Sequence, residues 1–448
     1  MFDPTNESSF RLDVAGLSAP FEVLAFTGNE ALSEPFAFEV DVLVEDAHLD
    51  LASLLHRSAF LCFGAAHEGV HGQLQSLLQH EHGSSSRLCR VQLGPKLSCL
   101  ALRFSQRIFS GQSVVQMLDQ VLKEHGITGA QRRFDCCAEH SPGTFCTQYC
   151  ESDLQFLQRL CAQARLHYYF EHRRDGHCLV FGDDPAGLPT TAVARFAVAG
   201  EEAVPAVRQW QLQDKVQHAP ATAPLRTAQG QTHLAGLRSG QWLPLTGHPL
   251  AECNRRWLLT RVEHHADQLM EPVYSNQIFA LEQASALAPT AASSRRRMHS
   301  LQRAWVVEVD EPRPDHSRPV AVQFDWLYQG EGAAPSHCWL PLAPALQQAP
   351  SAILGEGVEV VVSFLEGDPD QPIISGILQN PVASLDEEYQ PPSPVSPMSL
   401  SDNTRRLLQS AEPLLLLCLI PGGGSFNHCA HSVCTCRLVT ALEQSGGQ

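Results

Sequence analysis

Residues 355–380, with the sequence GEGVEVVVSFLEGDPDQPIISGILQN, restrict the possible fold more than any other stretch of this chain. Apolar residues alternate with others along its first half, which is the period-2 pattern of a β-strand with one buried face. The turn sequence GDPD at residues 367–370 leads into a second apolar strand, in which Gly376 favours a bulge. A single hairpin is only marginally stable, so we expect further strands to complete a barrel. The predicted residues of the barrel core and of the subunit contact are Val358, Val360, Val362, Phe364, Ile373 and Ile374.

The composition is that of an ordinary globular protein. Of the 448 residues, 44% are hydrophobic and 18% are charged, and a chain of this length commonly forms about two to four domains. The formal net charge of −17 argues against a nucleic-acid-binding surface, which is normally basic. No run reaches the roughly 18–20 consecutive apolar residues that a membrane span needs. The N-terminal sequence MFDPTNESSF lacks the basic and apolar regions of a signal peptide, so we expect cytoplasmic synthesis and folding.

Fifteen cysteines are scattered along the chain, most of them within apolar runs. In such runs a cysteine behaves as a small hydrophobic residue, and an odd number in a long chain does not favour a disulfide framework. We therefore expect buried free thiols outside the C-terminal tail, as in a reducing compartment.

The first part of the chain predicts a mainly β structure with a few α-helices. Strand-like runs between Gly-, Ser- and His-containing turns favour a β-barrel. These runs lie at residues 21–26, 36–44, 59–63, 71–78, 88–93 and 98–104, with turns at 28–30 and 33–35. Ser113 with Gln116, and Ser152 with Gln155, form capping boxes before apolar residues at helical spacing, which predicts two helices. Residues 166–184 then predict a β-hairpin.

The remaining sequence alternates between strands and segments with little regular pattern. Residues 183–240 are rich in Pro, Ala, Gly and Gln and show little strand signal beyond residues 207–212, whereas residues 257–262 predict a strand. After a linker at residues 286–300, five short strands predict an OB-type barrel. They span residues 305–309, 320–324, 338–340, 358–364 and 373–378. Residues 390–401 are an extended Pro-rich segment.

Several long segments resemble, in order, the VgrG family of type VI secretion spike proteins. These segments are residues 21–42, 107–127, 148–184 and 239–266, and residues 355–380 resemble the end of the small OB-type barrel of that family. The resemblance implies phage-hub-like β-barrels in residues 1–295, the second one shortened, and an OB-type spike barrel in residues 300–382. It further implies a Pro-rich linker at 383–401 and a short tail at 402–448. The long β-helical needle usual in the family has no counterpart here, so we expect a short form.

The same resemblance implies a structural role. The chain is expected to be a homotrimeric, non-enzymatic spike that caps the secretion tube, delivers effectors and is itself injected through the type VI apparatus. The implied partners are the tube protein Hcp, a PAAR-type tip protein or an effector or adaptor, and baseplate proteins. Neither nucleic acid nor a membrane-spanning segment is expected.

The sequence HEGVH at residues 67–71 keeps an enzymatic alternative open, because it matches the HExxH pattern of zinc metallopeptidases. In those enzymes a helix places both histidines on one face, with the glutamate beside the metal-bound water. Gly64, Gly69 and Gly72 surround the motif, and neighbouring Val and Phe residues favour strands. The resemblance to the VgrG family implies the tip of a hairpin here, with solvated side chains. We therefore interpret the match as a coincidence.

The C-terminal tail carries a dense group of candidate metal ligands, namely His428, Cys429, His431, Cys434 and Cys436. Imidazole and thiolate both suit Zn or Fe, and such a site can fold a short tail that has no core. The alternatives are an effector enzyme that uses this cluster and a poorly ordered tail with incidental ligands. Asp368 and Asp370 lack the other ligands of an EF-hand and predict a turn. No P-loop, nucleophile elbow or Rossmann fingerprint is present, so we predict no catalytic residue and no further cofactor.

Overall fold

A computed structural model describes residues 10–46, 48–64, 68–82, 87–143, 145–197, 206–215, 225–282, 297–310, 319–327, 337–347 and 351–378. The chain divides into two compact units. The first unit comprises Met1–Leu100, Leu118–His140 and Leu157–Ala292, and the second comprises Ala101–Met117, Ser141–Phe156 and Ser293–Gln448. No helix of the described residues is long and apolar enough to cross a membrane. The eleven cysteines within these residues are free thiols, but only six of them are buried, and Cys137 is exposed, so the expected burial holds only in part.

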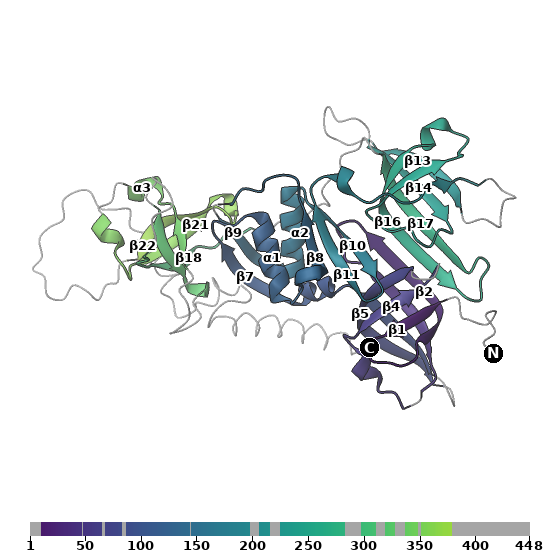
Figure 1. The fold of residues 1–448 in the computed structure, drawn as a ribbon. Coiled ribbons are helices and arrows are strands. Elements are labelled where there is room, and N and C mark those ends of the chain that lie inside the picture. Colours follow the sequence, from purple (N-terminus) through teal and green to yellow (C-terminus); the bar gives the residue numbers. More distant parts are fainter. Residues whose placement is uncertain are drawn as a thin grey trace, which may run out of the picture. The chain divides into compact units, whose positions relative to one another are not determined.

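The first unit contains a closed β-barrel, drawn in purple and blue in Figure 1. Its strands follow the order β1-β4-β5-β6-β3-β2, and β1 pairs with both β4 and β2, so the sheet closes on itself. Closure removes the unpaired edges that an open sheet would expose. The strands are β1 (Arg11–Val14), β2 (Phe21–Ala31), β3 (Ala37–Val44), β4 (Ser58–Cys62), β5 (Gly69–His82) and β6 (Arg87–Gly94).

Strand β2 runs without interruption through residues 28–30, where the sequence GNE predicted a turn. Gly28 pairs with Phe38 of β3 and with His264 of a later strand. A Cβ atom on Gly28 would lie 2.1 Å from Cε1 of Phe38, so the glycine makes room for this buried ring. The turn prediction was therefore wrong at this position, because Gly28 serves a close side-chain approach within a strand.

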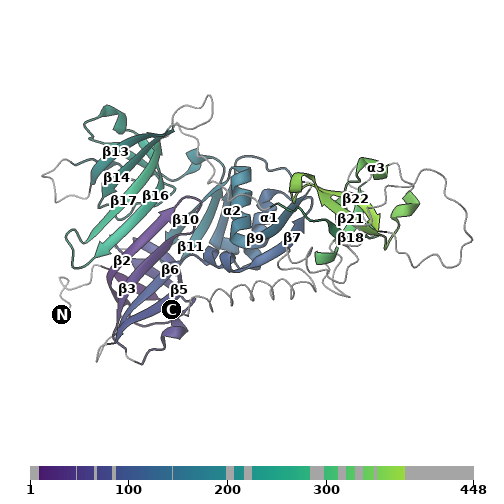
Figure 2. The ribbon, with the colours of Figure 1, turned by 180° about the vertical axis from the view of Figure 1, so that it is seen from behind.

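A half-barrel extends the same sheet beyond β2. Strand β16 pairs with β2, and the order continues through β17, β14 and β13, while β15 pairs with β16 and β12 with β15. Figure 2 shows β13, β14, β17 and β16 side by side. The strands are β12 (Ala194–Arg195), β13 (Val207–Lys215), β14 (Leu225–Thr232), β15 (Trp242–Thr246), β16 (Arg256–Asp267) and β17 (Tyr274–Glu282). The sequence did not reveal β14, because its residues LRTAQGQT are mostly polar.

A smaller sheet of the first unit has the order β10-β11-β8, in which β8 runs parallel to β11. Its strands are β8 (Arg132–Asp135), β10 (His167–Arg173) and β11 (Gly176–Gly182), and β10 and β11 form the predicted hairpin. The predicted helices are α1 (Val114–Glu124) and α2 (Asp153–Ala164). In both capping boxes the backbone N–H donates to the glutamine Oε1, from Ser113 to Gln116 at 2.8 Å and from Ser152 to Gln155 at 2.9 Å. The helix predictions are confirmed.

The second unit contains a five-stranded barrel and the separate pair β7–β9. The barrel order is β20-β19-β18-β21-β22, and a bridge between Leu342 and Ile374 links the chain after β20 to β22. This small, nearly closed arrangement confirms the OB-type barrel. The elements are β7 (Phe104–Phe109), β9 (Cys146–Ser152), β18 (Gln302–Val306), β19 (Val320–Phe324), β20 (Cys338–Leu340), α3 (Pro344–Gln347), β21 (Glu359–Phe364) and β22 (Pro372–Leu378).

Candidate functional site

The hairpin β21–β22 supplies most of the predicted barrel residues. Val360, Val362 and Ile374 are fully buried in the core of the second unit, and Val358 and Phe364 pack against them. Ile373 is half-buried and lies outside this cluster, because successive residues of a strand point to opposite faces.

The observed hairpin differs from the predicted one-sided burial of β21 and contains the predicted bulge. Val361 is also fully buried, so β21 is covered on both faces rather than on one at this point. The register of β21 and β22 shifts between Val361 and Val362, whose partners are Gly376 and Ile374, which places a bulge where Gly376 predicted one.

The turn between β21 and β22 is built by its two aspartates. Oδ1 of Asp368 accepts the backbone N–H of Asp370 at 3.0 Å, which is the local bond expected of a turn residue. The carbonyl of Pro369 accepts the hydroxyl of Thr147, a residue of β9, at 2.9 Å. The turn prediction is confirmed, and the turn also contacts a strand that lies far earlier in the sequence.

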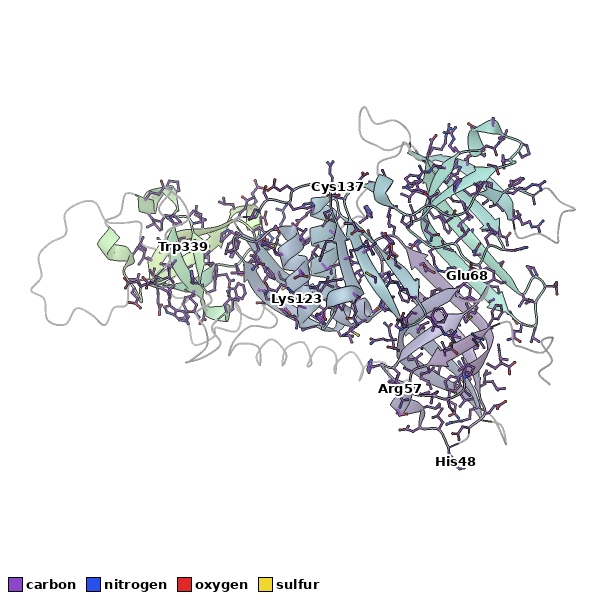
Figure 3. The ribbon with its side chains drawn as sticks, viewed as in Figure 1. His48, Arg57, Glu68, Lys123, Cys137 and Trp339 are labelled. Atoms are coloured by element: carbon purple, nitrogen blue, oxygen red, sulfur yellow. The ribbon has the colours of Figure 1, made fainter. Side chains whose placement is uncertain are left out.

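Residues 68–71, the described part of the HEGVH motif, do not form the helix that a zinc peptidase requires. His71 lies within β5, where it pairs with Phe60 of β4, and Glu68 directly precedes this strand, while His67 lies outside the described residues. Glu68 is marked in Figure 3. Its carboxylate lies beside Gly64, where an added Cβ atom would be 2.6 Å from Oε2. A strand rises about 3.3 Å per residue and does not gather these residues on one helical face, so the described part of the motif lacks the geometry that gives it chemical meaning.

Three histidines meet where the hairpin β10–β11 packs against β5. Nδ1 of His71 lies 3.0 Å from Nδ1 of His177, and the backbone N–H of His71 donates to Nδ1 of His172 at 3.2 Å. Phe36 packs edge-on against the rings of His172 and His177. Burial lowers the pKa of all three imidazoles, to about 4 for His172 and to about 3 for His177. The expectation of a solvated His71 was wrong, because the side chain is only 7% exposed.

A group of buried ionic side chains connects β2 with β16 in the first unit. Oε1 of Glu30 lies 3.1 Å from Nε2 of His264 and 3.6 Å from Nε of Arg238. Burial alone would raise the pKa of Glu30, but the charge of Arg238 and the hydrogen bond with His264 outweigh it and lower that pKa. Arg238 also lies over the ring of Phe63 at 5.0 Å. These contacts are satisfied within the fold and indicate a structural role.

A second buried ionic group lies in the second unit, around Asp153 at the start of α2. Its fully buried carboxylate accepts Nε of Arg103 at 2.6 Å and Nη2 of Arg107 at 2.8 Å. Nε2 of Gln148 donates to the same carboxylate at 2.8 Å. The arrangement joins β7, β9 and α2, and it holds no exposed group that is poised for acid–base chemistry.

One group of three possible metal ligands comes together among the described residues, formed by Cys136, His140 and Asp183. Burial raises the pKa of the Cys136 thiol to about 11, and the nearby carboxylates of Asp183 and Asp135 act in the same direction. This group was not predicted from the sequence, because Asp183 lies far from the other two residues in the chain. The tail cluster His428, Cys429, His431, Cys434 and Cys436 lies outside the described residues.

Known proteins share both the sequence and the fold of this chain. The family model of the phage tail baseplate hub (GPD) matches residues 29–224 and 221–270. The type VI secretion system spike proteins VgrG5 and VgrG4b of Pseudomonas aeruginosa are 32% and 31% identical to it, and each match covers 95% of the chain. The chain spans 62% and 61% of the length of these two relatives, less than two thirds.

A solved structure supports the same assignment at the level of the fold. It is a component of the type VI secretion system of E. coli, described as similar to the T4 bacteriophage tail proteins gp27 and gp5. The TM-score is 0.69 at 22% sequence identity, and the match covers 82% of this chain and 99% of that chain. The chain therefore belongs to the phage tail baseplate hub family, and its resemblance to the VgrG spike proteins is confirmed.

Proposed function

We propose that this chain is the hub-and-spike subunit of a type VI secretion apparatus and that it acts as a homotrimer. The observation that carries the proposal is the combination, in one chain, of a closed barrel, a half-barrel and an OB-type barrel. Relatives whose sequences match 95% of the chain are named as type VI spike proteins. A spike needs rigidity and a defined axis, and barrels repeated around a three-fold axis supply both.

Exposed apolar side chains support an assembly of several subunits. In the first unit, Leu269 is 95% exposed and its neighbour Met270 is 57% exposed. In the second unit, Leu102 is 82% exposed and Phe104 is 57% exposed. Single exposed apolar residues are common on protein surfaces, but paired large ones favour a surface that another chain covers. We assign both pairs to subunit or partner contacts.

The proposed partners follow from the proposed place in the apparatus. The tube protein Hcp would stack below the hub, a PAAR-type tip protein, effector or adaptor would bind above the OB-type barrel, and baseplate proteins would surround the hub. The chain would be expelled through the apparatus together with its cargo. This role needs no catalysis, and the strand conformation of His71 removes the motif that favoured a zinc metallopeptidase.

Light scattering on the purified full chain tests the assembly. We expect three times the chain mass of 49.1 kDa at micromolar concentration. A stable monomer over the same range would overturn the trimer. The matched variant Phe104→Asp should shift the mass toward the monomer, whereas Lys123→Asp, a change on the exposed face of α1, should not.

A secretion assay tests the role itself. A strain that lacks this chain should release no Hcp into the medium, and the wild-type chain should restore that release. A variant that cannot form the OB-type barrel, Val360→Asp, should fail to restore it. Undiminished Hcp release without the chain would contradict the proposal if no second spike protein is present in the strain.

A further inference from the structure

The edge of the small sheet in the first unit brings three strand ends together. Strands β8 and β11 are parallel, so their carboxyl ends meet at the same edge, where Asp135 pairs with Gly182. Cys136 directly follows β8, and Asp183 directly follows β11. His167, the first residue of β10, pairs with Gly182 from the other side. Cysteine, carboxylate and imidazole side chains therefore gather at one edge of the sheet.

Asp183 holds the loop that follows β8 in a fixed conformation. Its Oδ1 accepts the backbone N–H of Cys137 at 2.8 Å, and its Oδ2 accepts that of Ala138, also at 2.8 Å. The loop consequently turns back and brings Nε2 of His140 to 3.4 Å from Oδ2 of Asp183. One ligand atom from each of Cys136, His140 and Asp183 lies within 4.8 Å of the other two.

The imidazole of His140 is the least satisfied member of this group. Its Nε2 atom is buried and accepts or donates no hydrogen bond within the described residues. A buried nitrogen without a partner costs free energy, and in native proteins it usually marks a bound water, an ion or a functional group. The two bonds that Asp183 makes explain the loop conformation, but they leave this nitrogen with a 3.4 Å contact to Oδ2 of Asp183 and no hydrogen bond among the described residues.

We infer that Cys136, His140 and Asp183 form a zinc site, a site separate from the tail cluster. Sulfur, nitrogen and oxygen donors of these three types are the ligands that Zn²⁺ takes in proteins, and three protein ligands leave one tetrahedral position to water. On binding, the Cys136 thiol releases its proton to solvent and the thiolate coordinates the ion. Each oxygen of Asp183 retains a lone pair beside its backbone hydrogen bond, so the carboxylate coordinates without breaking the loop. The bound ion would hold the loop that follows β8 against the end of β11.

Metal analysis of the full-length chain tests this site apart from the tail. The background variant carries Cys429→Ser, Cys434→Ser and Cys436→Ser, which removes the thiolates of the tail cluster. This protein is stripped with a chelator, dialysed against zinc chloride and measured by atomic emission. We expect one zinc per chain, and the same stoichiometry with cobalt(II), together with a thiolate-to-cobalt charge-transfer band in the near ultraviolet.

Single substitutions then locate the ion. Cys136→Ser should abolish the charge-transfer band, and both Cys136→Ser and His140→Gln should remove the bound metal under the same dialysis. The control Cys137→Ser, a neighbouring exposed thiol marked in Figure 3, should leave both the stoichiometry and the band unchanged. Zinc content that survives Cys136→Ser, or a background variant that binds no zinc at all, would overturn the site. Because light scattering reports the trimer independently, failure here would leave the proposed spike function standing.

Discussion

The backbone N–H of Thr147 donates a hydrogen bond of 2.6 Å to Oδ1 of Asp370, although 223 residues separate the two. Thr147 belongs to β9, and Asp370 belongs to the turn between β21 and β22. Tyr149, from the same strand, packs into the core of the OB-type barrel. Strand β9 is therefore fixed to the barrel hairpin by a charged hydrogen bond at the turn and by an apolar side chain in the core.

Replacing Asp370 by alanine should loosen this attachment. The substitution leaves the part-buried N–H of Thr147 without its charged acceptor, which costs about 1–3 kcal/mol. Urea unfolding followed by tryptophan fluorescence, at a fixed protein concentration, should show that loss of stability. Glu356→Ala, at an exposed position of the same unit, should change the stability by less than about 0.5 kcal/mol. Equal effects of the two changes would show that the bond to Thr147 contributes nothing.

The buried face of β21 gives a second prediction. Val360→Asp or Val362→Asp should prevent a soluble trimer, because each places a carboxylate in a fully buried apolar site at a cost of several kcal/mol. Glu359→Gln, at a half-buried position of the same strand, should be much milder. Light scattering of the soluble fraction compares the variants. Since Val361 is buried as well, Val361→Asp should resemble the first two changes rather than the third.

The sequence predicted elements whose determinants are local. The capping boxes at Ser113 and Ser152 and the alternation in residues 358–364 are set by neighbours a few residues away. Prediction from the sequence failed where a contact between residues far apart in the chain determines the local structure. Gly28 has the composition of a turn, but it lies within a strand because the ring of Phe38 needs the space, and β14 is held by its pairing with β17 rather than by apolar residues of its own.

The candidate sites could not be predicted from the sequence either, because they too depend on contacts between residues far apart in the chain. The histidine cluster joins positions 101 and 106 residues apart, and the group around Asp183 depends on the parallel pairing of β8 and β11. No spacing rule on a single sequence connects such residues. Conversely, HEGVH satisfied a spacing rule, but its last three residues lie in strand β5, where a rule for helices has no meaning.

The clustered histidines His71, His172 and His177 should make the first unit sensitive to acid. The ordinary pKa of histidine is 6.5, and burial lowers that of His172 to about 4 and of His177 to about 3. Below pH 6.5 the unfolded chain binds more protons than the folded one, so stability is fully present above pH 6.5 and falls as the pH drops toward 4. Each histidine contributes up to about 1.4 kcal/mol per pH unit in that window. Thermal unfolding between pH 7.5 and 5 should show the midpoint falling.

A matched pair of variants assigns this pH dependence. His177→Gln keeps a polar partner for His71 but does not titrate, so it should reduce the fall in the unfolding midpoint between pH 7.5 and 5. His265→Gln removes an exposed histidine of β16 and should leave the fall unchanged. If His177→Gln shows the full wild-type fall, the acid sensitivity arises from other groups.

Substitutions of Glu68 and His71, two of the described residues of the HEGVH motif, should separate a structural role from a catalytic one. His71→Ala leaves Nδ1 of His177 without its neighbour and should lower the stability of the first unit by about 1–3 kcal/mol. Zinc content should be the same in His71→Ala, in Glu68→Ala and in the wild type. Peptidase activity that disappears in both variants, together with a stoichiometric loss of zinc, would restore the metallopeptidase alternative.

Removing everything after Ser401 should leave the rest of the chain folded and trimeric, while attachment of a tip protein or cargo is lost. The reason is local, because the prolines in residues 390–401 cannot donate to a sheet ladder and uncouple the tail from the barrel. The apolar run LLLLCLI in the tail would promote aggregation if it were exposed to solvent. Three copies of the tail on one axis would shield this run in one another, with or without a metal at His428 to Cys436. Light scattering and a pull-down with a PAAR-type protein compare the truncated and full chains. A truncated chain that is insoluble or monomeric would show that the tail is part of the trimer and that the boundary at residue 401 is misplaced.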